Sequence, residues 1–180
     1  MIRSILHAVI RRFERHYDYD ATYMHEIADA SVPAFCKLAL AQVMGSHREA
    51  ISPDALFAAR IAAVRFEDCG PCAQLVVNMA LEAGVQPTMV RSIVARDLAR
   101  LSDDAALGLR LADAVLAHES TDGIRDEVVA RFGEKGLITL AYAIATTRTY
   151  PTMKRALGHA HTCERLRVQG ETVVAARAAA

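Results

Sequence analysis

Two cysteines lie close together in the segment Glu67–Cys72, which reads EDCGPC. The spacing of Cys69 and Cys72 allows their sulfurs to form a disulfide across one helical turn. If the pair opens a helix, the unpaired backbone N–H groups and the positive end of the helix dipole favour a thiolate. The residue types and their spacing therefore predict a reversible dithiol–disulfide pair.

The residues around the pair favour a helix start. Pro71 is tolerated in a first turn because the N–H that it lacks would have no intrahelical partner, and Gly70 leaves the approach to sulfur open. Asp68 is the predicted N-cap residue. Glu67 and Asp68 oppose thiolate formation while the helix dipole promotes it, a balance that the sequence leaves open. Glu67 is a candidate proton acceptor for a thiol; the alternative is a solvated surface carboxylate.

The residues near the pair also suit other uses. Gln74 is a candidate for contacting a bound group, with a polar residue on the outer face of the helix as the alternative. A zinc site would need a second ligand pair from His159, His161 and Cys163, but His161 does not share a helix face with the other two, so no metal is predicted. Thioredoxin also carries Cys-Gly-Pro-Cys, but after a strand, whereas the preceding segment here reads as a helix.

Composition places the pair in a helical protein. The 180 residues suit one domain, and 53% hydrophobic residues without tryptophan favour an all-α core of Ala, Leu, Val and Ile. Lys+Arg and Asp+Glu both number 21, so no net charge attracts nucleic acid. Four cysteines, no signal-peptide core and no uncharged membrane-spanning segment predict a cytoplasmic protein without a membrane partner.

Helical periodicity extends along most of the chain. Apolar residues at Ile2, Ile5, Val9 and Phe13 predict an amphipathic first helix that docks on the body or on another subunit; a membrane-surface helix is the alternative. Further helices are predicted at 31–45, at 52–66 with Ser52 as N-cap, and at 72–84. More follow at 88–101, 103–119, 124–132, 135–150 and 153–168, and no strand is predicted. Within one domain, we expect N-terminal helices at 1–50, a helical core at 51–170 and a frayed tail at 171–180.

A CxxC pair that opens a helix, followed by MALEAGV at Met79–Val85 and by the helical region Leu109–Gly158, resembles the AhpD-like alkylhydroperoxidase branch of the carboxymuconolactone decarboxylase superfamily. The resemblance covers about Ser52 to His161. It implies an AhpD-like bundle that forms a homo-oligomer. It also implies a redox-active disulfide without a bound cofactor, which reduces peroxide or exchanges disulfides with lipoamide or a thiol protein. Cys72 would attack and Cys69 would resolve the sulfenic acid.

The chain departs from that family in its proton relay. The family often has a histidine where this chain has Val76, and a glutamate in the region where this chain reads LFAAR. Without that relay, Cys69 becomes a second candidate nucleophile because it lies nearer the helix start and solvent, and Glu67 is the best local substitute for the base.

The sequence is consistent with three functions. The first is a thiol-dependent oxidoreductase, an antioxidant peroxidase or disulfide oxidoreductase that takes an external thiol or dithiol as reductant. The alternative is a catalytically weakened helical oligomer that acts as a redox-sensitive binding protein, which the missing histidine favours. Lactone decarboxylation ranks last because it leaves the cysteine pair unexplained.

Overall fold

Eight α-helices and a β-hairpin make up the described part of the chain, residues 2–159 and 165–175 of a computed structural model. The helices are α1 (Ile2–Tyr17), α2 (Thr22–Ala30), α3 (Val32–Gly45), α4 (Pro53–Phe66), α5 (Gly70–Glu82), α6 (Pro87–Ala95), α7 (Asp103–Leu116) and α8 (Asp122–Ala156). A short 3-10 helix, η1 (Leu98–Arg100), follows α6. The strands are β1 (Arg165–Val168) and β2 (Glu171–Val174).

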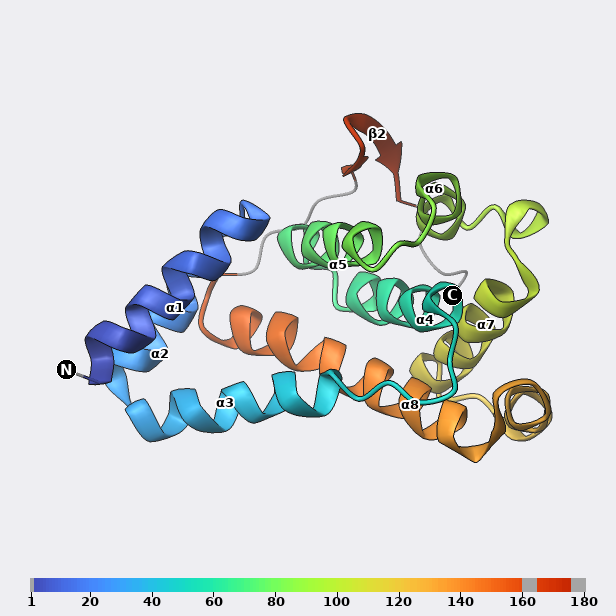
Figure 1. Ribbon diagram of the computed structural model, residues 1–180, viewed down its shortest axis with the longest axis horizontal. Coiled ribbons are helices and arrows are strands. Elements are labelled where there is room, and N and C mark those ends of the chain that lie inside the picture. Colours follow the sequence, from blue (N-terminus) through green and yellow to red (C-terminus); the bar gives the residue numbers. More distant parts are fainter. Residues whose placement is uncertain (1, 160–164, 176–180) are drawn as a thin grey trace.

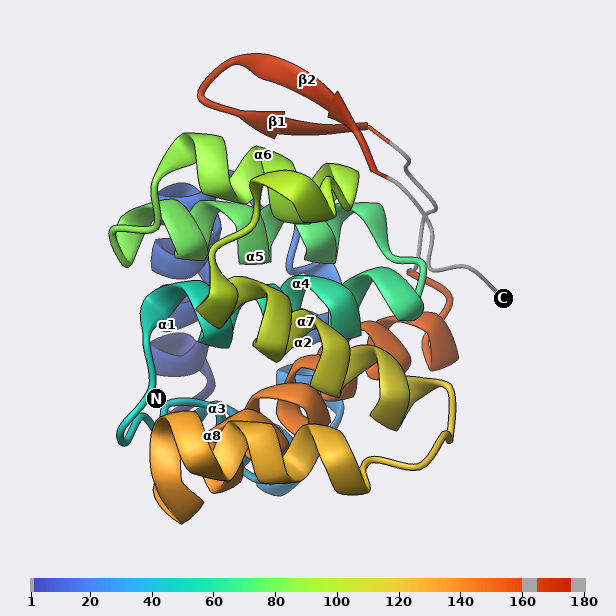
Figure 2. The ribbon, with the colours of Figure 1, turned by 90° about the vertical axis from the view of Figure 1, so that its right-hand side faces the viewer.

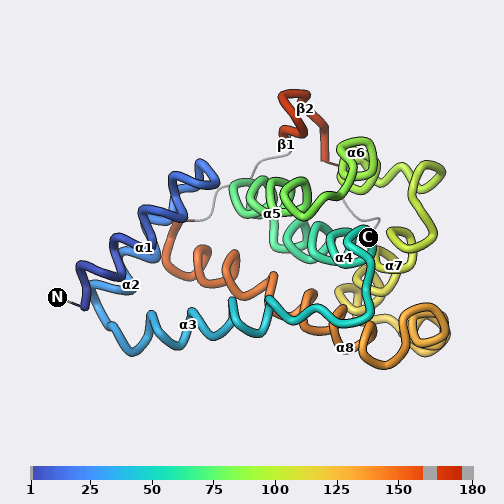
Figure 3. The backbone as a smooth tube through the Cα atoms, viewed as in Figure 1, coloured from blue at the N-terminus to red at the C-terminus, as the bar shows by residue number. Residues whose placement is uncertain are grey.

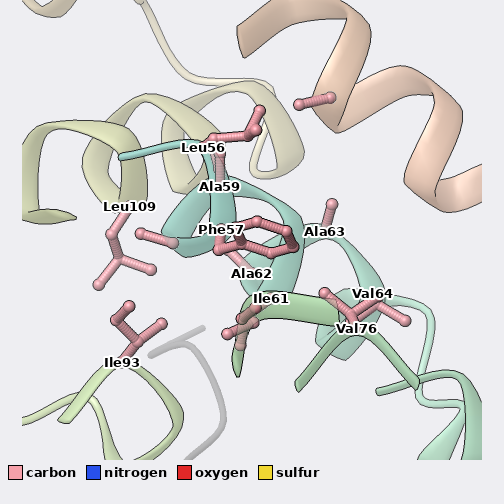
Figure 4. Packing of buried hydrophobic residues seen from close by; sticks show 14 of the residues in the cluster. Leu56, Phe57, Ala59, Ile61, Ala62, Ala63, Val64, Val76, Ile93 and Leu109 are labelled. Atoms are coloured by element: carbon pink, nitrogen blue, oxygen red, sulfur yellow. The ribbon is translucent and has the colours of Figure 1, made fainter. Parts of the chain in front are cut away.

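Helix α4 forms the centre of the body. Small and apolar residues surround most of its cylinder, and it packs against α5, α6, α7 and α8. Figure 4 shows Leu56, Phe57 and Ile61 of α4 among the buried side chains of this core. The crossing with α7 is close, because a Cβ added at Gly108 would lie 2.2 Å from the carbonyl oxygen of Ala55. The lack of a side chain at Gly108 therefore allows the two backbones to touch.

The helices stack in layers. Figure 1 shows α1, α2 and the start of α3 at one end of the molecule, with α8 running beside α3. The side view in Figure 2 shows the hairpin above α5 and α6, then α4 and α7, then α8 and α3. The backbone tube in Figure 3 shows the short connection that reverses the chain between α4 and α5. In the described chain, no helix is both long and apolar enough to cross a membrane.

The N-terminal helices pack more loosely than the body. Their shared apolar cluster contains Ile10, Tyr19, Ala21, Tyr23, Ile27 and Ala28. Within the described chain, α1 buries only Ile10 and α3 buries no residue. Six large apolar side chains of these two helices are exposed: Ile2, Ile5, Val9, Leu40, Val43 and Met44. The N-terminal layer thus leaves much of its apolar surface uncovered.

The β-hairpin is an exception to the predicted all-α fold, because no strand was predicted. Residues 153–168 were predicted to be helical, but α8 ends at Ala156 and β1 pairs antiparallel with β2. Gln169 (φ 49°) and Gly170 (φ 86°) form the two-residue turn that suits such a hairpin. Leu166 and Val168 are buried on one face. The strand β2 lies inside the segment 171–180 predicted to fray, of which residues 176–180 lie outside the described ones.

Helix boundaries follow the predicted caps in part. The hydroxyl of Ser52 accepts a hydrogen bond from the backbone of Ala55, which confirms it as the N-cap of α4. Helix α2 was not predicted. Helix α8 joins three segments that were predicted as separate helices, although Gly133 (φ 68°, ψ 177°) interrupts its helical backbone. The fold is therefore a mostly helical single domain with a small hairpin.

Candidate redox site

The connection between α4 and α5 builds the cysteine pair. Glu67 caps the end of α4, Asp68 takes a left-handed conformation (φ 50°), and Cys69 is extended. The Cys69 carbonyl accepts the first hydrogen bond of α5, from Ala73 at 2.9 Å. Cys69 is therefore the N-cap residue, and the prediction for Asp68 is wrong. Aspartate tolerates the left-handed region, so Asp68 serves as the turn residue before the cap.

The two cysteines form a disulfide at the start of α5. Their Cα atoms lie 5.3 Å apart, which is a usual separation for a bridged pair. Both residues are buried, with exposed fractions of 2% for Cys69 and 4% for Cys72. The expectation that Cys69 lies nearer solvent is thus not met. Cys72 lines a cavity of about 300 Å³.

Tyr19 approaches Cys72 from the loop between α1 and α2. Its hydroxyl lies 3.7 Å from the Cys72 sulfur, within hydrogen-bonding range for sulfur. Burial raises the pKa of Tyr19 to about 12, so the phenol keeps its proton at neutral pH. A neutral phenol in this position can donate to a thiolate on Cys72. No local pattern in the sequence predicts this contact.

A buried lysine lies behind Tyr19. The ammonium nitrogen of Lys154 lies 4.6 Å from the centre of the Tyr19 ring and donates to the backbone carbonyl of Asp20 at 3.1 Å. The residue is 1% exposed, and burial lowers its pKa. Lys154 therefore places a cation over the ring of Tyr19, the residue whose hydroxyl contacts Cys72.

Glu67 turns its carboxylate to α8. One oxygen accepts from the Arg148 guanidinium at 2.5 Å and the other from the Thr152 hydroxyl at 3.3 Å. The Arg155 guanidinium donates to the Glu67 carbonyl. The side chain is only 12% exposed, so it is not the solvated carboxylate of the alternative interpretation. Both carboxylate oxygens are thus held by partners on α8. The predicted role of Glu67 as a base stays a prediction.

Gln74 holds the hairpin on α5. Its amide nitrogen donates to the Arg167 carbonyl at 2.9 Å and its oxygen accepts from the Arg167 N–H at 2.7 Å. The amide thus bonds the backbone of β1 as a neighbouring strand would. The same nitrogen also donates to Asn78 at 2.9 Å. The structure gives this side chain an architectural use, and its predicted contact with substrate stays untested.

Val76 and Tyr150 line the same cavity as Cys72. Val76, in the place where the family often has histidine, is 8% exposed. Burial raises the pKa of Tyr150 to about 12. The cavity wall beside Cys72 thus combines apolar side chains with neutral phenols.

The structure describes one further cysteine, Cys36, and one of the candidate zinc ligands, His159. Cys36 is exposed on α3 and forms no disulfide with a described residue. His159 pairs with Glu26 at 2.8 Å. His161 and Cys163, the other candidate zinc ligands, lie outside the described residues. Among the described residues, no three His, Cys, Asp or Glu side chains are grouped as a metal site.

Comparison with protein-family models, with curated proteins and with solved structures finds no match to this chain. Its fold and site therefore rest on the residues themselves. They define a mostly helical domain with a CxxC pair at disulfide distance near the start of α5, an arrangement suited to redox chemistry.

Proposed function

We propose that this protein is a thiol-dependent oxidoreductase of the AhpD-like type, which reduces a peroxide or exchanges disulfides through Cys69 and Cys72. The observation that carries the proposal is the position of Cys72. Its side chain lines the cavity and lies beside the hydroxyl of Tyr19, whereas Cys69 is not among the cavity-lining residues. This arrangement supports Cys72 as the attacking sulfur and Cys69 as the resolving one.

The reaction requires two thiols and one peroxide. The Cys72 thiolate attacks the terminal oxygen of a hydroperoxide ROOH, the O–O bond breaks, and the alkoxide takes a proton to leave as ROH. Cys69 then attacks the sulfenic sulfur of Cys72, and the S–S bond forms as water leaves. An external dithiol reduces the disulfide by exchange and becomes oxidised. The sum is one ROOH and one dithiol converted to ROH, water and a disulfide.

Tyr19 and Lys154 take over part of the task of the missing histidine in this proposal. A phenol that stays protonated donates a hydrogen bond to the thiolate and lowers its energy. The Lys154 cation near the ring adds a favourable charge interaction with the nearby anion. Both residues stabilise the thiolate without removing its proton. The proton acceptor itself is therefore left to Glu67, as predicted from the sequence, or to solvent.

The test is the rate at which peroxide closes the reduced pair. Reduced protein is mixed with hydrogen peroxide or cumene hydroperoxide, quenched by alkylation at timed intervals, and mapped by peptide mass spectrometry. We expect the rate of disulfide formation between Cys69 and Cys72 to rise linearly with peroxide concentration. This rate should exceed the rate at which dithiothreitol is oxidised under the same conditions. Closure no faster than that of dithiothreitol would contradict a peroxidase. It would favour disulfide exchange or the redox-sensitive binding protein.

Self-association is part of the same proposal. The six exposed large apolar side chains of α1 and α3 form a surface that a second copy of the chain can cover. We expect analytical ultracentrifugation to give a mass above 19.6 kDa. A purely monomeric species at micromolar concentration would contradict this part of the proposal.

A further inference from the structure

The cavity beside Cys72 lies between the body and the N-terminal layer. Its walls come from α1, α2, α3, α4, α5 and α8, and apolar side chains predominate, among them Phe13, Phe35, Leu38, Leu75 and Met79. A volume of about 300 Å³ is at the lower end of the range for small-molecule sites. At about 30 Å³ per water-sized group, it holds roughly ten such groups. The exposed Val9 at its wall places part of the cavity at the surface.

One buried polar atom at this cavity, Nε of Arg60, has no hydrogen-bond partner among the described residues. The Arg60 guanidinium donates to the Gly45 carbonyl and lies 5.3 Å from the centre of the Phe57 ring. No carboxylate of the described chain forms an ion pair with it. Burial and the nearby Arg48 lower the pKa of Arg60 to about 10, so it remains charged at neutral pH. A partly buried guanidinium without an anion carries a desolvation cost, and a bound anion would offset it.

Arg60 of α4 and Cys72 of α5 line the same cavity. Helices α4 and α5 run in opposite directions (Figure 1), so the cavity is bordered by two antiparallel helices. An apolar chain of roughly ten groups matches the cavity volume of about 300 Å³.

We propose that the cavity binds a medium-chain monocarboxylic acid, with the carboxylate on the Arg60 guanidinium and the apolar chain directed along α4 and α5 toward Cys72. The hydroperoxide of such an acid, oxidised near its far end, would bring its O–O bond to the sulfur. This second step rests on the proposed function and uses the same balanced reaction. The binding step does not depend on it. Arginine and carboxylate match in charge and in paired hydrogen-bonding geometry.

Binding is tested with decanoate below its micellar concentration, by titration calorimetry. We expect saturable binding of one decanoate per chain, and Arg60→Gln is expected to weaken it about 10- to 100-fold, as for loss of a charged hydrogen bond. The matched control is Arg48→Gln, since the exposed Arg48 also lies near the Phe57 ring, at 5.6 Å, without lining the cavity. We expect it to change the affinity less than about twofold because its charge is screened by solvent.

A second measurement keeps the proposal falsifiable if Arg60→Gln does not fold. Unmodified protein is titrated with 1-decanol and decylamine beside decanoate. We expect at least about tenfold weaker binding of both, because neither supplies an anion for the guanidinium. Equal affinity for decanoate and decanol, no binding of decanoate, or an unchanged affinity in a folded Arg60→Gln variant would overturn the proposal.

Kinetics separates failure of this inference from failure of the proposed function. The closing rate of the cysteine pair is compared for 10-hydroperoxydecanoate and decyl hydroperoxide. We expect at least about tenfold faster closing at low concentration with the carboxylate, and loss of that preference in Arg60→Gln. Equal rates that are both fast would uphold the peroxidase and overturn the carboxylate site as a substrate site. Decanoate binding without fast closure by either peroxide would uphold the site and contradict the peroxidase.

Discussion

The body around α4 and the N-terminal layer bury their apolar side chains in different ways. In the body, alanines and Gly108 bring helices into backbone contact, and Leu56 and Phe57 are almost completely buried. In the N-terminal layer, aromatic side chains line a cavity, and Arg60 of α4 reaches the same cavity with an Nε atom that has no hydrogen-bond partner among the described residues. The close-packed region positions the cysteine pair on a rigid support. The loosely packed region leaves room beside Cys72 for a ligand.

Truncation of large apolar side chains should show the greatest difference in stability between the two regions. Phe57→Ala in the body should lower the free energy of unfolding by about 3–5 kcal/mol, because it leaves a cavity in a close-packed core. Phe35→Ala, at the wall of a cavity that already exists, should cost only about 1 kcal/mol. Urea unfolding followed by circular dichroism measures both. Equal losses would show that the two regions are packed alike.

Addition of one methyl group tests the close helix crossing. Gly108→Ala should lower the free energy of unfolding by about 1–3 kcal/mol, because its Cβ would meet the backbone of Ala55. Gly123→Ala is the matched control on α8, where a Cβ would meet nothing within 4 Å. Thermal unfolding of the two variants gives the comparison. A Gly108→Ala protein as stable as the control would contradict the described contact between α4 and α7.

Removal of one hydroxyl tests the role of the N-terminal layer in the chemistry. Tyr19→Phe should slow alkylation and peroxide-dependent closure of the reduced pair about tenfold, because the Cys72 thiolate loses a hydrogen-bond donor. The rate of iodoacetamide alkylation against pH reports the thiol pKa, which should rise in this variant. Tyr142→Phe is the control, since Tyr142 is 37% exposed and does not line the cavity. Equal effects of the two variants would exclude a role for Tyr19.

Alkaline pH should weaken the N-terminal layer first. Burial raises the pKa of Tyr19 and Tyr150 from 10.0 to about 12, and burial raises that of Tyr23 as well. Above pH 10 the unfolded chain loses phenol protons that the folded chain keeps, so stability falls as pH rises toward 12. The lowered pKa of Lys154 acts in the opposite sense below 10.5, where stability rises with pH.

Urea unfolding at about pH 8, 10 and 11, with tyrosinate absorbance in parallel, measures this effect below and within the titration range of the phenols. We expect late phenol ionisation coupled to a loss of stability above pH 10. Ionisation of all the tyrosines near pH 10 without any loss of stability would contradict the buried positions of Tyr19 and Tyr23.

Local signals predicted most of the helices and the cysteine position. Ser52 before Pro53 specifies a helix start by capping, and the apolar run of α4 reads as a buried helix. The hairpin had a signal that was missed: Leu166 and Val168 alternate with polar residues, and Gln169–Gly170 suits a two-residue turn. A helical interpretation of 153–168 ignored this period-two pattern.

Tertiary contacts around the site could not be predicted from local pattern. Tyr19 lies 53 residues from Cys72, and only the packing of the loop between α1 and α2 brings them together. Lys154 gives a similar case, because lysine is rarely buried and its partner is a backbone carbonyl of Asp20. Glu67 shows that closeness in sequence does not guarantee contact with the cysteine pair. It is adjacent in sequence to the pair, yet its carboxylate binds Arg148 of α8.

The most direct test asks which sulfur reacts first. Cys69→Ser and Cys72→Ser variants, reduced and treated with one equivalent of cumene hydroperoxide, are trapped with dimedone and mapped by mass spectrometry. We predict a sulfenic acid adduct on Cys72 in the Cys69→Ser variant and little adduct in the Cys72→Ser variant, because Cys72 lines the cavity beside Tyr19. Trapping on Cys69 alone would contradict the account, as would equal slow oxidation of both variants.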